Sequence, residues 1–217
     1  MTKLFRVWLS SFLMIYGSIN IAFGESNSRS PEAIALDASK DLMLLVRKSG
    51  SYTEENTERL FIDVEALLSP VVDFESFARG VMAVHYKRAS EEQRREFVST
   101  FRWGLVRTYA LALTEFADGE LSLVPNPKAQ RNPRYKNVKM QIRTKSGDVY
   151  PLIYVMRLGE SQGWRLANLI VNGINIGLTY RSQFASALQK PKYKGDLGKL
   201  IDDWADVIGK DDLNLAN

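Results

Sequence analysis

Cysteine is absent from the 217-residue sequence, and histidine occurs once, at position 85. Without cysteine the chain forms neither disulfide bonds nor thiolate metal sites, so an apolar core must supply its stability. A single histidine excludes a histidine-rich metal centre and makes His85 the only candidate base for a Ser-His-Asp triad. His85 stands beside Lys87 and Arg88 at an expected helix end, which favours a structural role. We expect no metal and no cofactor.

Sequence motifs of common enzymes are also missing. The chain has no G-x-S-x-G, no P-loop, no G-x-G-x-x-G and no H-E-x-x-H. A carboxylate acid/base site could still exist at Glu115, which projects from the apolar stripe of an expected helix. The pattern favours the alternative that Glu115 reaches solvent from the last helical turn.

Net charge is small. Residues 1–24 contain Lys3 and Arg6 and no acid, and subtracting these two from the formal charge of +4 leaves +2 for residues 25–217. Dedicated nucleic-acid binding needs many basic contacts to phosphates, so this balance gives it no support.

The only long apolar run lies at the N-terminus. Lys3 and Arg6 precede an apolar segment from Val7 to Ile19, and Ala22-Phe23-Gly24 has the small-x-small pattern of a signal-peptidase site. We therefore predict a signal peptide over residues 1–24, cleaved after Gly24. Residues 25–217 then form one domain with a helical extension.

An uncleaved membrane anchor is the alternative, because an apolar stretch of about 17 residues is at the lower limit for spanning a bilayer. Tyr16 and Asn20 interrupt this run, and the small residues that follow favour removal. A lipid-anchored form would need a cysteine at the cleavage point, which the chain lacks. An exported protein without cysteine fits the bacterial periplasm.

Four helices are expected in the first half of the chain. Ser30-Pro31 starts one that runs to Lys48, and Thr53 starts a second that ends before Pro70. Asp73 can cap a third, and the capping box Ser90-Glu91-Glu92-Gln93 begins a long helix that extends to about Ala117. Apolar residues form one stripe along this long helix, but Trp103 and Leu111 lie off it. The long helix should therefore pack on two sides.

The pattern changes to strands in the second half. Val138, Met140 and Ile142 alternate with polar residues, and further strands are expected over residues 149–158 and 164–171. The last two are apolar on both faces, which indicates a sheet that is covered on each side or curled. Asn172-Gly173 breaks the sheet, and helices follow over residues 175–188 and 196–208. This order indicates an α+β domain.

Several stretches together resemble the MlaC or toluene-tolerance family. They are WRLANLIVNGINI (164–176), YRSQF (180–184), VDF (72–74), ASEEQR (89–94) with Phe97 and Tyr109, and the region 198–201. The resemblance covers most of residues 25–217. It departs at Ala167-Asn168, where the family usually has Tyr-Asp, at Asn172 in place of Glu, and at Ala83 in place of a common glycine.

This resemblance implies a periplasmic phospholipid-binding component of an ABC transport system that maintains outer-membrane lipid asymmetry. Such a carrier shuttles between an outer-membrane lipoprotein complex and an inner-membrane complex with an MCE-domain protein and an ATPase. The implied fold is a curved antiparallel sheet, an NTF2-like cone, with helices closing an apolar cavity for acyl chains. Phospholipid is then cargo, and no reaction is catalysed.

Apolar residues of the long helix and the sheet are the candidates for lining such a cavity. Each could instead belong to an ordinary core, because apolar stripes at these spacings occur in every globular domain. The candidates are Phe101, Leu105, Tyr109, Val138, Met140, Ile142, Leu152, Tyr154, Leu169 and Val171.

Two other functions stay open from the residues alone. One is an enzyme on a similar cone-shaped sheet, using a buried carboxylate and a tyrosine on an apolar small molecule. The other is a structural envelope protein that binds other proteins. Extraction of the purified protein with organic solvent separates them, because abundant phospholipid favours the carrier.

The N-terminal pattern yields a first prediction. Protein purified from its native host should begin at about Glu25 and be recovered with the soluble periplasmic fraction. N-terminal sequencing measures this directly. An intact Met1 in the membrane fraction would show that the apolar run is an anchor.

Overall fold

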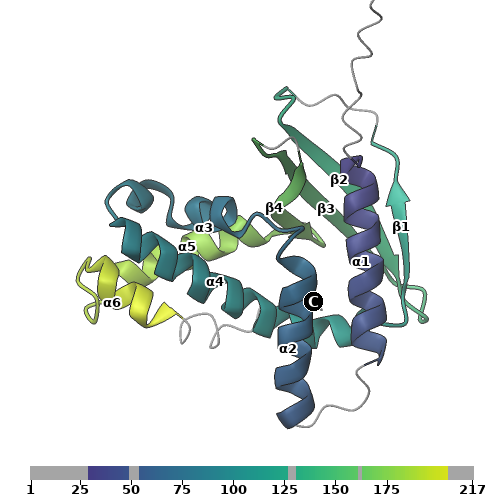
Figure 1. Ribbon diagram of the computed structural model, residues 1–217, viewed down its shortest axis with the longest axis horizontal. Coiled ribbons are helices and arrows are strands. Elements are labelled where there is room, and N and C mark those ends of the chain that lie inside the picture. Colours follow the sequence, from purple (N-terminus) through teal and green to yellow (C-terminus); the bar gives the residue numbers. More distant parts are fainter. Residues whose placement is uncertain (1–28, 49–53, 127–130, 161–162, 205–217) are drawn as a thin grey trace, which may run out of the picture.

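The computed structural model describes residues 29–48, 54–126, 131–160 and 163–204. The predicted signal peptide, and residues 205–208 of the last predicted helix, lie outside these ranges. No helix within them is both long and apolar enough to cross a membrane. The chain forms an α+β fold in which a helical bundle stands beside an antiparallel sheet (Figure 1).

The described residues form six α-helices and two 3₁₀ turns. Their order agrees with the order expected from the sequence. The elements are α1 (Pro31–Lys48), α2 (Glu54–Leu68), α3 (Phe74–Met82), η1 (Ala83–Lys87), α4 (Glu91–Ala112), η2 (Leu113–Phe116), α5 (Ile176–Leu188) and α6 (Leu197–Asp202).

The predicted caps start α3 and α4. The Asp73 carboxylate accepts a hydrogen bond from the Ser76 amide at 3.0 Å. The Ser90 hydroxyl accepts from the Gln93 amide at 3.2 Å, and the Gln93 side chain accepts from the Ser90 amide at 3.0 Å. Both caps satisfy backbone donors that the first helical turn leaves without partners.

The sheet is a five-stranded antiparallel meander in the order β1-β2-β3-β4-β5. Val138, Met140 and Ile142 face the protein interior from the second strand, as their alternation predicts. The prediction of a curved antiparallel sheet with helices beside it is confirmed. The strands are β1 (Glu120–Val124), β2 (Tyr135–Arg143), β3 (Val149–Leu158), β4 (Trp164–Val171) and β5 (Ile174–Asn175).

Two of these strands were not expected from the sequence. The sequence pattern predicts no strand over residues 120–124, which prolines follow, yet this segment pairs with β2 along its whole length. Asn172-Gly173 does not end the sheet. Both residues have positive φ, 48° and 83°, and they form a tight turn that leads into the short strand β5.

A β-bulge bends the central strands. Val155 pairs with Asn168, whereas the next residue, Met156, pairs with Leu166, so Ala167 is an extra residue in β4. Beyond the bulge the linker between α2 and α3 joins the sheet. The Asp73 amide donates to the Leu166 carbonyl and the Leu166 amide donates to the Val71 carbonyl, both at 2.8 Å. The bulge increases the local twist and curvature of the sheet.

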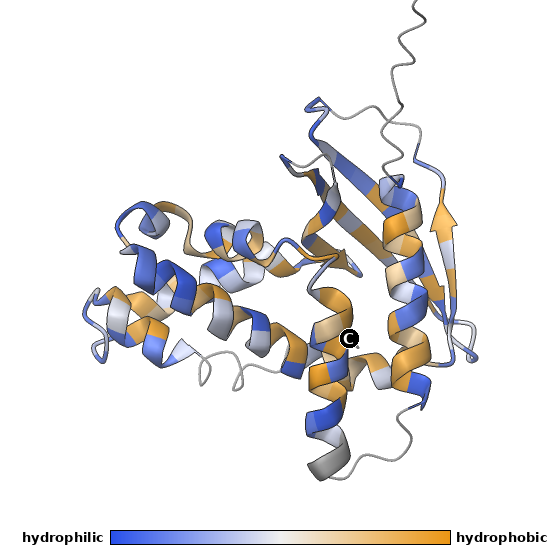
Figure 2. Ribbon diagram, viewed as in Figure 1, coloured by the Kyte–Doolittle hydropathy of each residue, from blue (hydrophilic) through white to orange (hydrophobic). Residues whose placement is uncertain are grey.

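Helix α4 packs on two sides, as predicted. Phe97, Phe101 and Leu105 join a cluster with α3, α5 and α6, whereas Val106 and Ala110 join a second cluster with α1 and α2. Trp103, off the main stripe, packs against the second cluster, whereas Leu111 is largely exposed. A third cluster lies between α1 and the sheet. Hydrophobic residues recur along α1, α2 and α4 (Figure 2).

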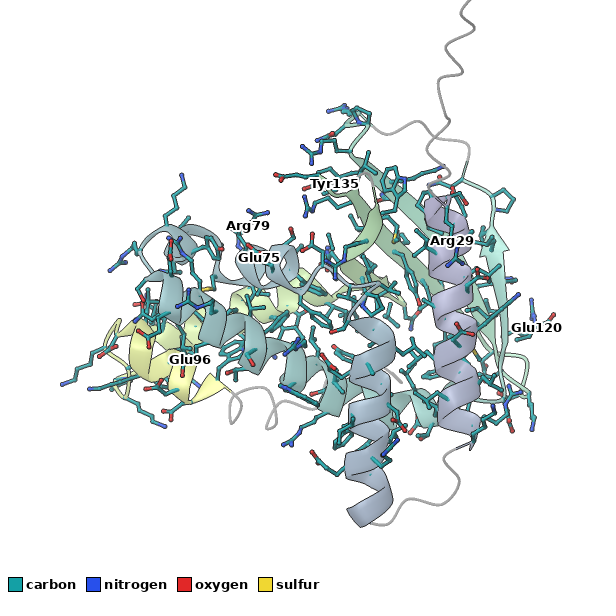
Figure 3. All side chains as sticks on the ribbon, in the orientation of Figure 1. Arg29, Glu75, Arg79, Glu96, Glu120 and Tyr135 are labelled. Atoms are coloured by element: carbon teal, nitrogen blue, oxygen red, sulfur yellow. The ribbon has the colours of Figure 1, made fainter. Side chains whose placement is uncertain are left out.

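Charged side chains surround these clusters. Glu75, Glu96 and Glu120 point outward from three different elements (Figure 3). Of the residues that the structure describes, only Ser39 and Asp73 are buried and polar.

The departure at Ala83 has a structural consequence. Ala83 follows α3 with φ 50° and ψ −119°, in a region that L side chains rarely adopt. Glycine adopts this backbone conformation without steric conflict. This explains why the related family commonly has glycine at this position. Alanine at this position stores backbone strain.

Ala83→Gly should therefore stabilise the protein. The strain that is relieved should outweigh the cost of the greater conformational entropy that glycine gives the unfolded chain. We expect the free energy of unfolding to rise by about 1 kcal/mol and the Tm by about 2–4 °C. As a control, Ala66→Gly on the exposed face of α2 should lower stability by about 0.5–1 kcal/mol. Thermal unfolding followed by circular dichroism compares the two, and equal losses would contradict strain at Ala83.

Candidate functional site

A cavity of about 180 Å³ lies where the three apolar clusters meet. Its walls come from α1, the end of α2, the start of α3, α4 with η2, the inner face of β2 to β4, and Ile176 at the start of α5. A cavity needs about 10–15 Å³ to hold one water molecule, so this cavity is much larger than an ordinary packing defect. The cavity can hold an apolar ligand.

Seven of the ten predicted residues line this cavity, from two facing walls. Leu105 and Tyr109 contribute from α4, and the other five contribute from the sheet. These five are Ile142, Leu152, Tyr154, Leu169 and Val171.

The other three predicted residues lie in packed core instead. Phe101 is fully buried among aromatic rings, with centroid distances of 5.3 Å to Phe77 and 5.5 Å to Tyr180. Val138 and Met140 are covered by Ala35 and its neighbours on α1. These neighbours fill the space that a ligand would need.

The sequence pattern did not predict that α1 contributes to the cavity wall. Ala35, Ala38 and Ser39 line the cavity from this helix. Their small side chains keep the α1 backbone near the sheet without filling the space between them. The one feature of the sequence that could have indicated this contribution is Ser39, a polar residue one turn after Ala35 on an otherwise apolar face of α1.

Two hydroxyl groups meet in the cavity wall. The Ser39 and Tyr154 side-chain oxygens lie 2.8 Å apart, and the Ser39 hydroxyl donates to the Ala35 carbonyl at 2.7 Å. Burial raises the pKa of Tyr154, and the bond to Ser39 partly offsets this rise. The phenol stays neutral at any physiological pH.

Tyr109 carries another buried hydroxyl. Burial raises its pKa, and the neighbouring Tyr180 adds to the shift. No described residue meets hydrogen-bond geometry with the Tyr109 oxygen, although Tyr180 is close. Tyr109 therefore acts as a neutral, mainly apolar wall residue.

No charged side chain is among the described residues that line the cavity. Glu115 is exposed outside it, as the pattern favoured. His85 lies against Phe184, with a centroid distance of 6.1 Å, in the helical part of the molecule. The carboxylate that the enzyme alternative requires is therefore not in this wall.

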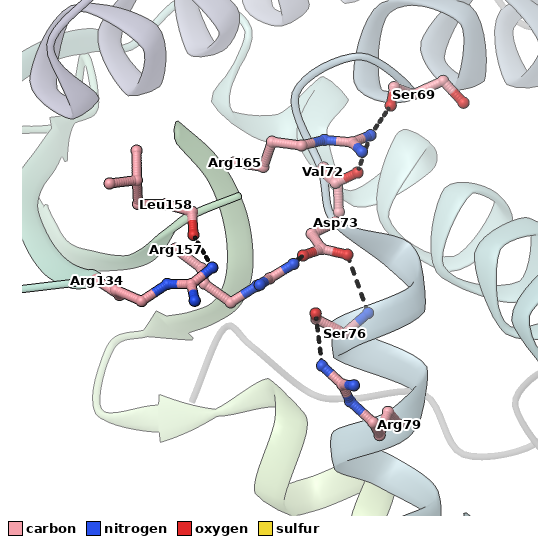
Figure 4. A network of polar contacts seen from close by, with 9 residues as sticks. All are labelled: Ser69, Val72, Asp73, Ser76, Arg79, Arg134, Arg157, Leu158 and Arg165. Atoms are coloured by element: carbon pink, nitrogen blue, oxygen red, sulfur yellow. Dashed lines mark hydrogen bonds and ion pairs between the residues drawn. The ribbon is translucent and has the colours of Figure 1, made fainter. Parts of the chain in front are cut away.

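A polar network fixes α3 to the sheet beside the cavity (Figure 4). Asp73 forms an ion pair with Arg157 of β3, and Arg165 of β4 donates to the Ser69 and Val72 carbonyls. Burial of Asp73 opposes its ionisation, but hydrogen bonds from the Ser76 amide and Arg157 outweigh this effect. They hold the pKa of Asp73 below its usual range.

Asn168 attaches the start of α5 to β4. Its side-chain oxygen accepts a hydrogen bond from the Gly177 amide, and its side-chain nitrogen donates one to the side-chain oxygen of Asn175, each at 2.9 Å. A Cβ at Gly177 would lie 2.7 Å from the Asn168 oxygen, so glycine is required for this approach. The Asn168 side-chain amide uses both its donor and its acceptor in these two bonds, so asparagine at this position has a structural role.

Comparison with known protein families agrees with this architecture. The family model described as "MlaC protein" matches residues 37–206, which is most of the chain. The chain belongs to the MlaC family. All seven predicted residues at the cavity fall within the matched range.

Two curated relatives support the membership of this MlaC-family chain. "Toluene tolerance protein ttg2D" of Pseudomonas putida is 32% identical over 186 residues, which cover 84% of this chain and 83% of that protein. "Intermembrane phospholipid transport system binding protein MlaC" of Haemophilus influenzae is 25% identical over 149 residues, which cover 68% and 69%.

A solved structure shows the same fold. It is the phospholipid-binding protein from Ralstonia solanacearum in complex with a phospholipid, at a TM-score of 0.72 and 21% identity. The match covers 87% of this MlaC-family chain and all of that one.

The Asp73 network yields a pH-dependent prediction. Because the folded pKa is below the unfolded value of about 4, the stabilisation is complete above pH 4 and is lost as the pH falls through the folded pKa. Asp73→Asn should cost about 1.5–3 kcal/mol at pH 7 and progressively less below pH 4. Urea unfolding at several pH values measures this.

The matched control is Asp63→Asn, which breaks the more exposed i,i+4 pair with Arg59. It should cost only about 0.3–0.5 kcal/mol. A loss at Asp73 that stays the same from pH 7 to pH 2 would contradict the account of this ion pair.

Proposed function

We propose that this protein is a periplasmic phospholipid carrier whose cavity holds acyl chains. The observation that carries the proposal is the apolar cavity between α4 and the sheet, lined without any charged side chain from the described residues. Membership of the MlaC family and the phospholipid transport named for the Haemophilus relative support the same function.

Physical chemistry explains why such a carrier is needed. Moving a lipid into water exposes its chains at about 0.8 kcal/mol for each methylene, so about thirty methylenes make unaided transfer prohibitively slow. An apolar cavity replaces bilayer hydrocarbon at nearly equal free energy. Loading and unloading then run close to balance, and partners can set the direction.

The proposed route runs between membranes. The carrier exchanges lipid with an outer-membrane lipoprotein complex and with an inner-membrane complex of an MCE-domain protein and an ATPase, and so maintains outer-membrane lipid asymmetry. It enters the periplasm by means of the signal peptide expected over residues 1–24. It catalyses no reaction and uses no metal or cofactor.

Extraction of the purified mature protein with organic solvent is the experiment that tests this function. We expect phospholipid to co-purify without strong headgroup selectivity, because the described wall is apolar and offers no charged partner for a headgroup. Native mass spectrometry should show the complex. Delipidated protein that takes no phospholipid from vesicles would overturn the proposal.

Glutamate substitutions test whether the cavity holds the chains. Leu105→Glu and Ile142→Glu introduce a charge that can point into the cavity and hydrate once lipid has left. We expect both variants to stay folded and to lose bound lipid. Circular dichroism and quantitative lipid extraction measure the two properties.

Phe101→Glu is the matched control from the same stripe of α4. Its charge would be buried among packed rings, so this variant should lose several kcal/mol and unfold. If Leu105→Glu and Ile142→Glu stay folded and retain full lipid, the cavity is not the binding site.

A further inference from the structure

Ser39 is an unexpected residue in the cavity wall. It is 7% exposed, and Asp73 is the other buried polar residue in the described part of the chain. Asp73 is accounted for because it caps α3 and pairs with Arg157. Ser39 is not needed for α1 itself, since an alanine would continue the helix with a better propensity, and its contacts are to the Ala35 carbonyl and to Tyr154.

The partner of Ser39 is also at the cavity. Tyr154 is a partly buried residue, and it lines the cavity from β3. The 2.8 Å contact between the two oxygens therefore brings a pair of hydroxyls to a wall that is apolar apart from its tyrosines, of which Tyr109 is one.

The protons of this pair can be arranged in two ways. In one, Tyr154 donates to Ser39 while Ser39 donates to the Ala35 carbonyl at 2.7 Å. In the other, Ser39 donates to Tyr154, which frees the Tyr154 proton for an acceptor in the cavity. The Ala35 carbonyl already accepts the amide of its own helix, so the second arrangement leaves no buried acceptor without a partner.

We propose that the Ser39–Tyr154 pair donates a hydrogen bond to an acyl-ester carbonyl of the cargo, so that the cavity selects ester-linked over ether-linked lipids. This inference rests on the proposed function. Among the parts of a glycerophospholipid that are next to the chains, the ester carbonyls are the strong acceptors. A dialkyl lipid has the same chains and headgroup but lacks these carbonyls, so its binding leaves the pair in its first arrangement.

Competition between two lipids tests this inference. Delipidated protein is incubated with vesicles that contain equal amounts of diacyl and dialkyl phosphatidylcholine of matched chain length, and the bound ratio is measured by mass spectrometry. We expect the wild-type protein to favour the diacyl lipid about fivefold, the effect of one hydrogen bond. Tyr154→Phe should bring the ratio close to one, and Ser39→Ala should reduce it.

The control is Tyr193→Phe, which removes a buried phenol outside the cavity and should keep the wild-type ratio. A ratio within one protein does not depend on how stable that protein is, so a merely structural role of the pair would leave it unchanged. Equal binding of both lipids by the wild type, or a preference that survives Tyr154→Phe, would overturn the inference. Uptake of neither lipid would instead overturn the proposed function.

Discussion

Helix α4 has to bury apolar side chains on two sides, and the other elements are arranged around this requirement. One side of α4 packs with α3, α5 and α6, and the other packs with α1 and α2. The sheet cannot also contact α4 along its full length, because α1 covers much of its inner face. A space remains between Leu105 on α4 and Ile142 on β2, and it is the cavity.

A cavity of this kind would be costly if nothing filled it. At about 24 cal/mol for each Å³, a cavity of about 180 Å³ would cost about 4 kcal/mol, a large share of a typical domain's stability. Polar contacts between the helices and the sheet around the cavity offset part of this cost. Asp73 with Arg157 holds α3 on the sheet, and Asn168 with Gly177 holds α5. A lipid that fills the space would add stability in proportion to its affinity.

Much of the fold could be predicted from local chemistry. The caps at Asp73 and Ser90 and the alternation through Val138, Met140 and Ile142 each specify an element. β1 was missed because its five residues end near prolines and depend on pairing with β2, which is a non-local interaction. The sequence pattern could not distinguish residues that line the cavity from residues of the packed core. Phe101 and Leu105 share one stripe, and only the rings of Phe77 and Tyr180, which come from other elements, make Phe101 core.

The proposed function requires that acyl chains occupy the space between α4 and the sheet. Photocrosslinking with a phospholipid that carries a diazirine near the end of one acyl chain tests this most directly. After irradiation of the loaded protein, peptide mass spectrometry should locate the crosslinks on the cavity wall, at residues such as Leu105, Tyr109 and Leu152. Crosslinks confined to the outer face of the sheet, or to the exposed surfaces of the helices, would contradict the account.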